Sequence, residues 1–255
     1  MLLEKRLEQI LKLVEQNGSV TVQELTGLLG ASESTVRRDL VLLAEEGRIN
    51  KVHGGATAVS SYYDRDEDME SRKNLNREEK IEIARYAASL IKPDDLVYLD
   101  AGTTTERMID FITERSAVYV TNAIGHAKRL VEAGCEAHIL GGKFKLATEA
   151  IVGNETVSEL EKYNFTIGFI GTNGVSRQSG FSTPDIDEAL VKKKAIMQCR
   201  RPYILCDAEK FNQISHITFA AFEDATILTT EVKSSTYKGA KNIIEVSRGK
   251  KGDTA

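Results

Sequence analysis

The sequence predicts an α/β protein in which an N-terminal winged helix-turn-helix precedes a larger, doubly wound and mainly parallel α/β domain. Three observations support this fold class. Helical patterns separated by a tight turn lie near the N-terminus, a highly charged segment follows them, and short apolar runs then alternate with helical stretches. We therefore expect a winged module in residues 1–59, a charged linker in 60–80 and an α/β domain in 81–255.

The first sixty residues contain three helical patterns. Apolar side chains in residues 3–16 recur at the i, i+3, i+4, i+7 spacing of an amphipathic helix, which ends before Gly18. Thr21 and Glu24 have the spacing of a capping box and begin a short second helix. After a tight turn, Ser32 is the expected N-cap of a third helix. Two helices joined in this way predict a helix-turn-helix.

A hairpin and a linker are expected after these helices. The segment from Arg48 to Ala56 alternates polar and apolar residues and contains the Gly54-Gly55 pair, a pattern typical of a short hairpin wing. Residues 60–80 are polar and heavily charged, and no apolar periodicity returns before Ile81. The linker is therefore placed there.

Six short apolar runs beyond the linker are predicted as buried strands, and helical stretches separate most of them. This alternation is typical of a parallel sheet, in which ligands bind at the carboxyl ends of the strands. The runs are Leu96–Leu99, Val118–Val120, His138–Leu140, Thr166–Ile170, Tyr203–Leu205 and Thr226–Leu228.

Composition and charge exclude several classes of protein. Hydrophobic residues make up 41% of the chain and charged residues 28%, as in ordinary globular proteins. No apolar run is long enough to span a bilayer, so we expect a cytoplasmic protein with no membrane partner. The scattered cysteines and histidines indicate reduced thiols, no metal site and no cofactor. The net charge of −4 makes local charge placement decisive for nucleic-acid binding.

The third helix carries the candidate DNA-reading residues. Hydroxyl side chains and two arginines occupy its first turns, and this part of a recognition helix meets base edges in the major groove. For an isolated segment the alternative is an ordinary capped helix with solvated arginines. Because one face is buried, one arginine, which we take to be Arg38, is expected to pair with an acid or a phosphate. The predicted DNA contacts are Ser32, Ser34, Thr35, Arg37, Arg38, Lys51 and His53.

Polar loops that follow the predicted strands form a candidate effector site. Gly102 would admit a close ligand, and Thr103 and Glu106 have capping spacing, so donors would gather at a helix start as a phosphate requires. A plain helix start or turn is the alternative for each loop, and Glu188 with Lys192 could be a surface ion pair. The predicted effector contacts are Asp100, Gly102, Thr103, Thr104, Thr105, Thr121, Asn122, Gly141, Gly142, Asn173, Gly174, Glu188, Lys192, Asp207 and Lys210.

Two motifs resemble those of the DeoR family of bacterial regulators. The segment Ser32–Leu40 followed by Val52-His53-Gly54-Gly55-Ala56 is similar to the family's DNA-binding signature, although Lys51 stands where relatives commonly carry arginine. The polar loops follow the order of motifs in the family's sensor domain. This resemblance covers nearly the whole chain. It implies a sensor domain of the sugar-phosphate isomerase-like type, a homodimer or homotetramer, and double-stranded operator DNA as partner.

The finer wording of the sensor motifs most resembles fructose-operon repressors. Segments such as Phe169–Val175 and Gly180–Asp185 carry this likeness. It implies a repressor that fructose 1-phosphate releases from operator DNA. Lactose-operon repressors that sense tagatose 6-phosphate are the alternative.

Two other classes of function are alternatives to a regulator. The sheet could belong to a sugar-phosphate isomerase that uses Asp100, Glu188 or Asp207 as a base, but we expect a protein that is not an enzyme. A DNA-organising protein without sequence preference conflicts with the negative net charge.

Overall fold

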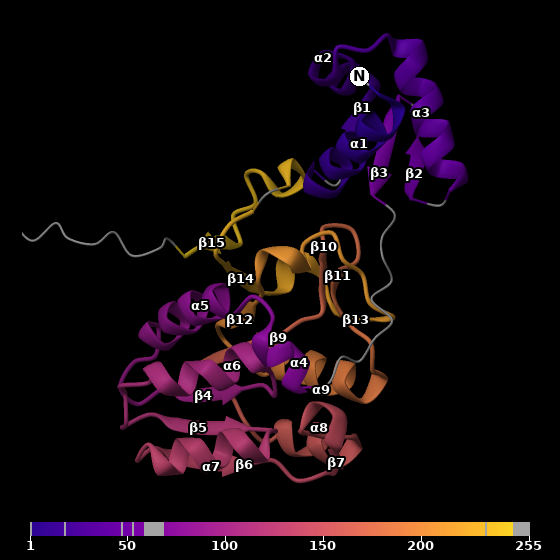
Figure 1. Ribbon diagram of the computed structural model, residues 1–255. Coiled ribbons are helices and arrows are strands. Elements are labelled where there is room, and N and C mark those ends of the chain that lie inside the picture. The colour runs from indigo at the N-terminus through magenta and orange to yellow at the C-terminus, as the bar shows by residue number, and fades with distance from the viewer. Residues whose placement is uncertain are drawn as a thin grey trace, which may run out of the picture. The chain divides into compact units, whose positions relative to one another are not determined.

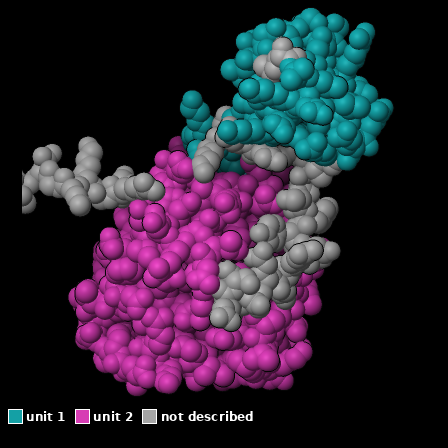
Figure 2. All heavy atoms as spheres, viewed as in Figure 1, with its two compact units in different colours: residues 1–61, 232–239 teal, residues 62–231, 240–255 magenta. Residues whose placement is uncertain are grey.

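The chain divides into two compact units (Figures 1 and 2). Unit 1 comprises residues 1–61 and 232–239, and unit 2 comprises residues 62–231 and 240–255. The chain therefore passes between the units three times. The computed structural model describes residues 2–17, 19–46, 48–52, 54–58, 69–232 and 234–246.

Three helices of unit 1 form the predicted helix-turn-helix: α1 (Leu3–Asn17), α2 (Val22–Leu29) and α3 (Glu33–Glu45). Thr21 caps α2, since its hydroxyl accepts from the backbone N–H of Glu24 at 3.2 Å while the Glu24 carboxylate accepts from the N–H of Thr21 at 2.8 Å. Ser32 caps α3 by accepting from the N–H of Thr35 at 3.3 Å. Both predicted helix starts are confirmed.

A three-stranded antiparallel sheet completes unit 1. Strands β2 (Ile49–Val52) and β3 (Gly55–Ala58) form the predicted wing, and β1 (Ser19–Thr21), which was not predicted, pairs with β3. Gly55 is required at this crossing because a Cβ atom there would lie 2.1 Å from the carbonyl oxygen of Val20.

A buried ion pair joins α1 to α3 in unit 1. Asp39 is 4% exposed, and its carboxylate accepts from Nε of Arg6 at 2.5 Å and from the Arg6 terminal nitrogen at 3.1 Å. This two-bond geometry fixes the orientation of the guanidinium as well as its position. The pair lies beside an apolar core that includes Ile10, Val36 and Leu40.

Residues 232–239 contribute to unit 1 although they lie late in the sequence. The hydroxyl of Ser234 donates to the carbonyl oxygen of Asn17, the last residue of α1, at 2.9 Å. Tyr237 is only 3% exposed and belongs to the short 3-10 helix η5 (Ser235–Tyr237). The end of α1 is therefore held by a segment that returns from unit 2.

The central sheet of unit 2 has seven parallel strands. They are β4 (Leu96–Leu99), β5 (Val118–Thr121), β6 (Glu136–Ile139), β9 (Ile167–Gly171), β12 (Pro202–Leu205), β14 (Thr226–Thr229) and β15 (Ile243–Glu245). Their order is β15-β14-β12-β9-β4-β5-β6, so the direction of winding reverses between β4 and β9 (Figure 1). Open α/β sheets bind ligands outside the carboxyl ends of the strands at such a switch point. The six predicted strands are confirmed to within two residues, and β15 was missed. The burial expected of the strand at His138–Leu140 is wrong, because β6 lies at the edge of the sheet and none of its residues is buried.

Helices and two small sheets complete unit 2. The helices are α4 (Met69–Asn74), α5 (Arg77–Ser89), α6 (Thr103–Met108), α7 (Ile124–Glu132), α8 (Asn154–Leu160) and α9 (Ile186–Met197), with 3-10 turns η1 (Ile109–Phe111), η2 (Leu146–Thr148), η3 (Ala208–Lys210) and η4 (Phe222–Asp224). The small antiparallel sheets, not predicted, are β10 (Gly174–Ser176), β11 (Gly180–Thr183) and β13 (Ile217–Ala220), and β7 (Lys143–Lys145) with β8 (Ala150–Val152). Over the described ranges, no helix is long and apolar enough to cross a membrane.

The prediction of a linker in residues 60–80 is wrong for the second half of this segment, which is helical. Residues 60–68 lie outside the described residues, but 69–80 contain α4 and the first turn of α5. The charge of the segment and its lack of apolar periodicity before Ile81 indicated a linker. In the structure Lys80 is buried and shares one face of α5 with Ile83, Ala84 and Ala87. A lysine in phase with an apolar stripe was the signal that this segment is part of the fold.

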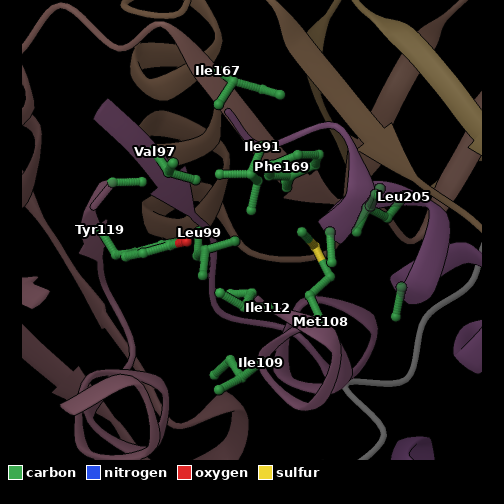
Figure 3. Packing of buried hydrophobic residues seen from close by; sticks show 14 of the residues in the cluster. Ile91, Val97, Leu99, Met108, Ile109, Ile112, Tyr119, Ile167, Phe169 and Leu205 are labelled. Carbon is green, nitrogen blue, oxygen red and sulfur yellow. The ribbon is translucent and has the colours of Figure 1, made fainter. Parts of the chain in front are cut away.

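The main core of unit 2 lies against the central sheet. Figure 3 shows Val97 and Leu99 of β4 and Phe169 of β9 packed near Met108 and Ile109, which follow the loop after β4. These side chains are fully or almost fully buried. The core therefore fixes the carboxyl ends of β4 and β9, from which the candidate site is built.

Candidate functional site

The exposed face of α3 carries most of the predicted DNA contacts. Ser32, Ser34, Arg37 and Arg38 are exposed, and Thr35 is half-buried. The Ser32 hydroxyl lies 3.0 Å from that of Ser34 and 2.9 Å from that of Thr35, so the three hydroxyls form one local cluster. The first turns of α3 thus present hydroxyls and guanidinium groups on one surface.

The two arginines of α3 have different surroundings. Arg37 donates to Glu33 at 3.2 Å, and both side chains are more than half exposed, so this i,i+4 pair contributes little and can exchange for another anion. Among the described residues Arg38 has no ion pair. The acidic partner expected for Arg38 therefore belongs to Arg37, while the alternative phosphate contact of Arg38 stays a prediction.

The wing extends the same surface. Arg37, Arg38 and Val41 of α3 line a shallow pocket together with Lys51 of β2. Three cations from two elements thus surround one hollow, an arrangement that favours contact with phosphate oxygens. His53 lies outside the described residues.

We expect Arg37→Ala to weaken specific operator binding by about 1–3 kcal/mol, the contribution of an arginine that reads a base edge. Gel-shift affinity for the native operator measures this, with Lys128→Ala, an exposed lysine of α7 in unit 2, as control. Unchanged affinity of a folded Arg37→Ala protein would remove Arg37 from the interface.

A polar cavity lies at the carboxyl ends of β4, β9 and β12 in unit 2. It occupies the switch point of the sheet and combines loops far apart in sequence. The predicted effector residues that line it are Gly102, Thr103, Thr104, Thr105, Asn173, Glu188, Lys192, Asp207 and Lys210.

The loop after β4 presents hydroxyl groups to this cavity. The capping contact expected between Thr103 and Glu106 is absent, because Gly102 is the N-cap and Glu106 instead pairs with Lys73 at 3.2 Å and with Arg129 at 3.3 Å. The Thr105 hydroxyl is engaged by the loop itself, donating to the carbonyl oxygen of Gly102 at 2.9 Å.

Thr103 and Thr104 differ from Thr105. Within the part of the chain that the structure describes, their hydroxyls make no hydrogen bond, and both residues line the cavity. A ligand would therefore find two hydroxyl donors in the loop without displacing an existing contact.

Lys192 of α9 enters the cavity as one half of a buried ion pair. Its ammonium group lies 2.5 Å from the carboxylate of Asp100, whose side chain is 2% exposed and also accepts from the N–H of Gly171 at 3.0 Å. Burial raises the pKa of Asp100 even though Lys192 and this hydrogen bond oppose it. Asp100 therefore orients Lys192 from behind the cavity wall.

Glu188, one turn before Lys192, is also buried. Its carboxylate accepts from the ammonium group of Lys145 at 3.0 Å and from the hydroxyl of Thr148 at 2.7 Å. Burial acts to raise the pKa of Glu188, but Lys192, Thr148 and Lys145 outweigh it and lower that pKa. The alternative of a surface ion pair between Glu188 and Lys192 is wrong, since both belong to a buried network.

Two predicted contacts support the cavity from below and do not line it. Asn122 accepts from the N–H of Ala101 at 2.8 Å and donates to the carbonyl oxygen of Ile151 at 3.1 Å, so it joins the loop after β4 to β8. Thr121 is fully buried, and its hydroxyl accepts from the N–H of Ala123. The structure therefore does not bring Thr121 and Asn122 into the cavity lining.

Three predicted glycines also lie outside the cavity lining. The N–H of Gly141 donates to Glu159 of α8, and a Cβ atom on Gly142 would lie 2.2 Å from the Thr156 hydroxyl. A Cβ atom on Gly174 would lie 2.4 Å from the carbonyl oxygen of Gln213. These glycines allow close backbone packing and are not brought to the cavity.

The cavity also has residues that the sequence analysis missed. Arg72 and Asn76 come from the segment taken as linker, and the Asn76 amide donates to Glu209 at 2.8 Å. The other missed polar lining residues are Lys80, Thr148, Thr172 and Glu209. The lining residues of α4 and α5 precede β4 in the sequence. The rule that ligand-binding residues directly follow strands therefore does not predict them.

Together these features define a DNA-binding transcription regulator with a ligand-sensing domain. The profile described as the DeoR-like helix-turn-helix domain matches residues 6–62, and that of the DeoR C terminal sensor domain matches residues 75–232. The chain belongs to the DeoR family of transcriptional regulators.

Curated relatives match almost the full length of the chain. One, described as the uncharacterized HTH-type transcriptional regulator FruR of Bacillus subtilis, is 42% identical over 96% of this chain and 99% of its own length. The HTH-type transcriptional regulator GlpR of Haloferax volcanii is 32% identical over 91% of each chain. A lactose phosphotransferase system repressor of Staphylococcus aureus is 30% identical over 95% of this chain and 98% of its own.

Proposed function

We propose that this protein represses a sugar-utilisation operon and that a sugar phosphate bound in the cavity of unit 2 releases it from operator DNA. The observation that carries this proposal is the cavity at the sheet's switch point. Thr103 and Thr104, whose hydroxyls make no hydrogen bond within the described residues, line it together with the buried cations Lys80 and Lys192. Hydroxyl donors and cations together are what a phosphate dianion needs when it leaves water.

Fructose 1-phosphate is the proposed effector, and fructose utilisation the proposed pathway. The similarity to a regulator named FruR at 42% identity supports this choice over tagatose 6-phosphate, which the more distant lactose phosphotransferase repressors favour. We propose binding without turnover, because the matched relatives are named regulators and repressors. Exchange of substrate protons with solvent would contradict that part.

The proposed assembly is a homodimer or homotetramer that holds paired operator half-sites. The α3 surface with the wing contacts DNA, and the cavity residues contact effector. Coupling between two such sites is typically about 1–3 kcal/mol, or roughly 5- to 150-fold in affinity. This size of change is enough for an inducer to empty an operator.

We expect fructose 1-phosphate to bind the wild-type protein and to lower its operator affinity, whereas Lys210→Ala and Thr103→Val keep operator binding and lose release. Lys210→Ala has the larger effect because it removes a charge, whereas Thr103→Val removes one hydroxyl group. Calorimetric titration and gel shifts measure both steps, with tagatose 6-phosphate as comparison. If neither sugar phosphate binds the wild-type protein, the effector assignment fails while the DNA-binding assignment stands.

A further inference from the structure

Lys80 of α5 is a buried cation in the wall of the cavity. It is 5% exposed, and across the described residues its ammonium group makes a single hydrogen bond, to the carbonyl oxygen of Arg72, and no ion pair. An ammonium group has three donors, so two remain for a ligand. Asp207 acts on this ammonium group only at longer range, and a buried lysine without a direct ion pair is rare, since burying a charge is unfavourable.

Charge is distributed unevenly around the cavity. On the α9 side, Lys192 is bonded to Asp100 and lies near Glu188, so its charge is already balanced. The lining residues contributed by α4, α5 and the turn after β12 include three cations and two carboxylates, and one of these carboxylates accepts from Asn76. These charged residues are Arg72, Lys80, Lys210, Asp207 and Glu209.

We infer that Lys80 is the principal cation for an anionic ligand of this cavity, and that the phosphate of the effector lies between Lys80 and the Thr103-Thr104 loop. The identity of the ligand in this inference rests on the proposed function, whereas the existence of an anion site at Lys80 is independent of it. Lys192, which Asp100 orients, is then left to face the ligand's neutral, hydroxyl-bearing end. The charge distribution thus gives the ligand one orientation in the cavity.

The surroundings of Lys80 support this assignment. Burial lowers the pKa of Lys80 to about 8. Asp207 on η3 opposes this change, whereas Lys210 of the same turn adds to it. Arg72 of α4 and Arg107 of α6 also lower the pKa. An anion bound beside Lys80 would reverse the effect of burial and raise this pKa, so binding and protonation of Lys80 are linked.

The sign of the resulting pH dependence follows directly. The pKa of Lys80 is about 8 in the protein without ligand, and a bound anion raises it. Affinity for the anion is therefore full below that pH and falls as the pH rises through it. Sulfate is a suitable probe, as its own charge is constant in this range.

The position of Lys80 also links the anion to the chain's first helix in unit 2. The ammonium group that would bind the anion also holds the backbone of α4 through Arg72. Helix α4 is the first described element after the residues that lead from unit 1. The anion would therefore stabilise α4 at the point where the chain enters unit 2.

The test uses full-length wild type, Lys80→Met, Lys80→Arg and the control Lys193→Met, an exposed lysine of α9 outside the cavity lining. Calorimetry or thermal shift measures affinity for sulfate and for fructose 1-phosphate from pH 6 to 9. We expect Lys80→Met to bind sulfate and fructose 1-phosphate about tenfold or more weakly than the wild type. Its affinity should also no longer decrease above about pH 8. Lys80→Arg keeps binding, without the pH dependence, because arginine stays charged.

The outcomes separate this inference from the proposed function. Sulfate binding that depends on Lys80, with no binding of either sugar phosphate, keeps the anion site and refutes the effector. Wild-type-like sulfate affinity in Lys80→Met, or no sulfate binding by the wild type, overturns the inference. A merely structural role predicts that a folded Lys80→Met protein keeps its sulfate affinity, whereas an anion-binding role predicts lost sulfate affinity in a protein that circular dichroism shows to be folded. If Lys80→Met does not fold, the pH dependence of sulfate binding by Lys80→Arg tests the same point.

Discussion

Replacing Lys192 by methionine is expected to destabilise unit 2 by about 3–5 kcal/mol, because Asp100 would remain buried without its ionic partner. Methionine keeps most of the volume of the lysine stem, so loss of charge and not of packing dominates. Calorimetric unfolding should show unit 2 melting earlier while unit 1 is unchanged.

The pH dependence of this variant gives a second measurement. Without Lys192, burial and the charge of Glu188 are opposed only by the hydrogen bond from Gly171, so the folded-state pKa of Asp100 rises further. A carboxyl whose pKa is raised on folding contributes stability at low pH and loses it as the pH rises through the folded-state value. The Lys192→Met protein should therefore approach wild-type stability near pH 4 and fall behind it toward neutral pH.

A double variant is the matched control for this prediction. Asp100→Asn with Lys192→Met removes both charges, and replacing a buried ion pair as a whole is often neutral. The double variant should thus recover much of the lost stability and show little pH dependence. If it is as unstable as Lys192→Met alone, the effect comes from packing around α9 and not from an unpaired Asp100.

Gly55→Ala is expected to disrupt unit 1 and with it operator binding. A Cβ atom at this position would lie 2.1 Å from the carbonyl oxygen of Val20, so β1 and β3 must separate. Forcing a group into a packed site costs about 1–3 kcal/mol or more, a large share of the stability of a domain of about 60 residues. Circular dichroism and gel shifts measure the two losses.

Gly27→Ala is the matched control for Gly55→Ala. Gly27 lies inside α2, and a Cβ atom there would meet no other atom within 4 Å. Alanine is favoured over glycine in a helix by roughly 0.5–1 kcal/mol, so this variant should be slightly more stable. Equal effects of the two substitutions would contradict the close approach at Gly55.

Local signals explain which parts of the fold could be predicted. The starts of α2 and α3 depend on side chains of neighbouring residues, Thr21 with Glu24 and Ser32 with Thr35, and the buried strands are continuous apolar runs. By contrast β7 has three residues, none of them buried, and β1 has one buried side chain. Such short strands depend on pairing with distant partners, which the sequence pattern does not contain.

The candidate site was predictable only in part for a similar reason. Residues directly after β4 and β12 reach the cavity, as the rule for parallel sheets indicates. Asn122 follows β5 in the same way, but its amide is bonded to Ala101 and Ile151, a pairing between distant loops that the sequence pattern does not contain. Lys80 comes from a helix upstream of β4, and only the apolar phase of that helix points to it.

The passage of residues 232–239 into unit 1 bears on the engineering of hybrid regulators. Consider a chimera in which residues 1–61 of this protein are replaced by the DNA-binding domain of another regulator. Its Ser234 and Tyr237 would then have to pack with an α1 from the other protein. The DNA-binding domain of this protein is thus encoded in two separate stretches of the gene. A transplant that is meant to keep the native packing at the end of α1 has to carry both stretches, with 232–239 grafted into the recipient between the equivalents of β14 and β15.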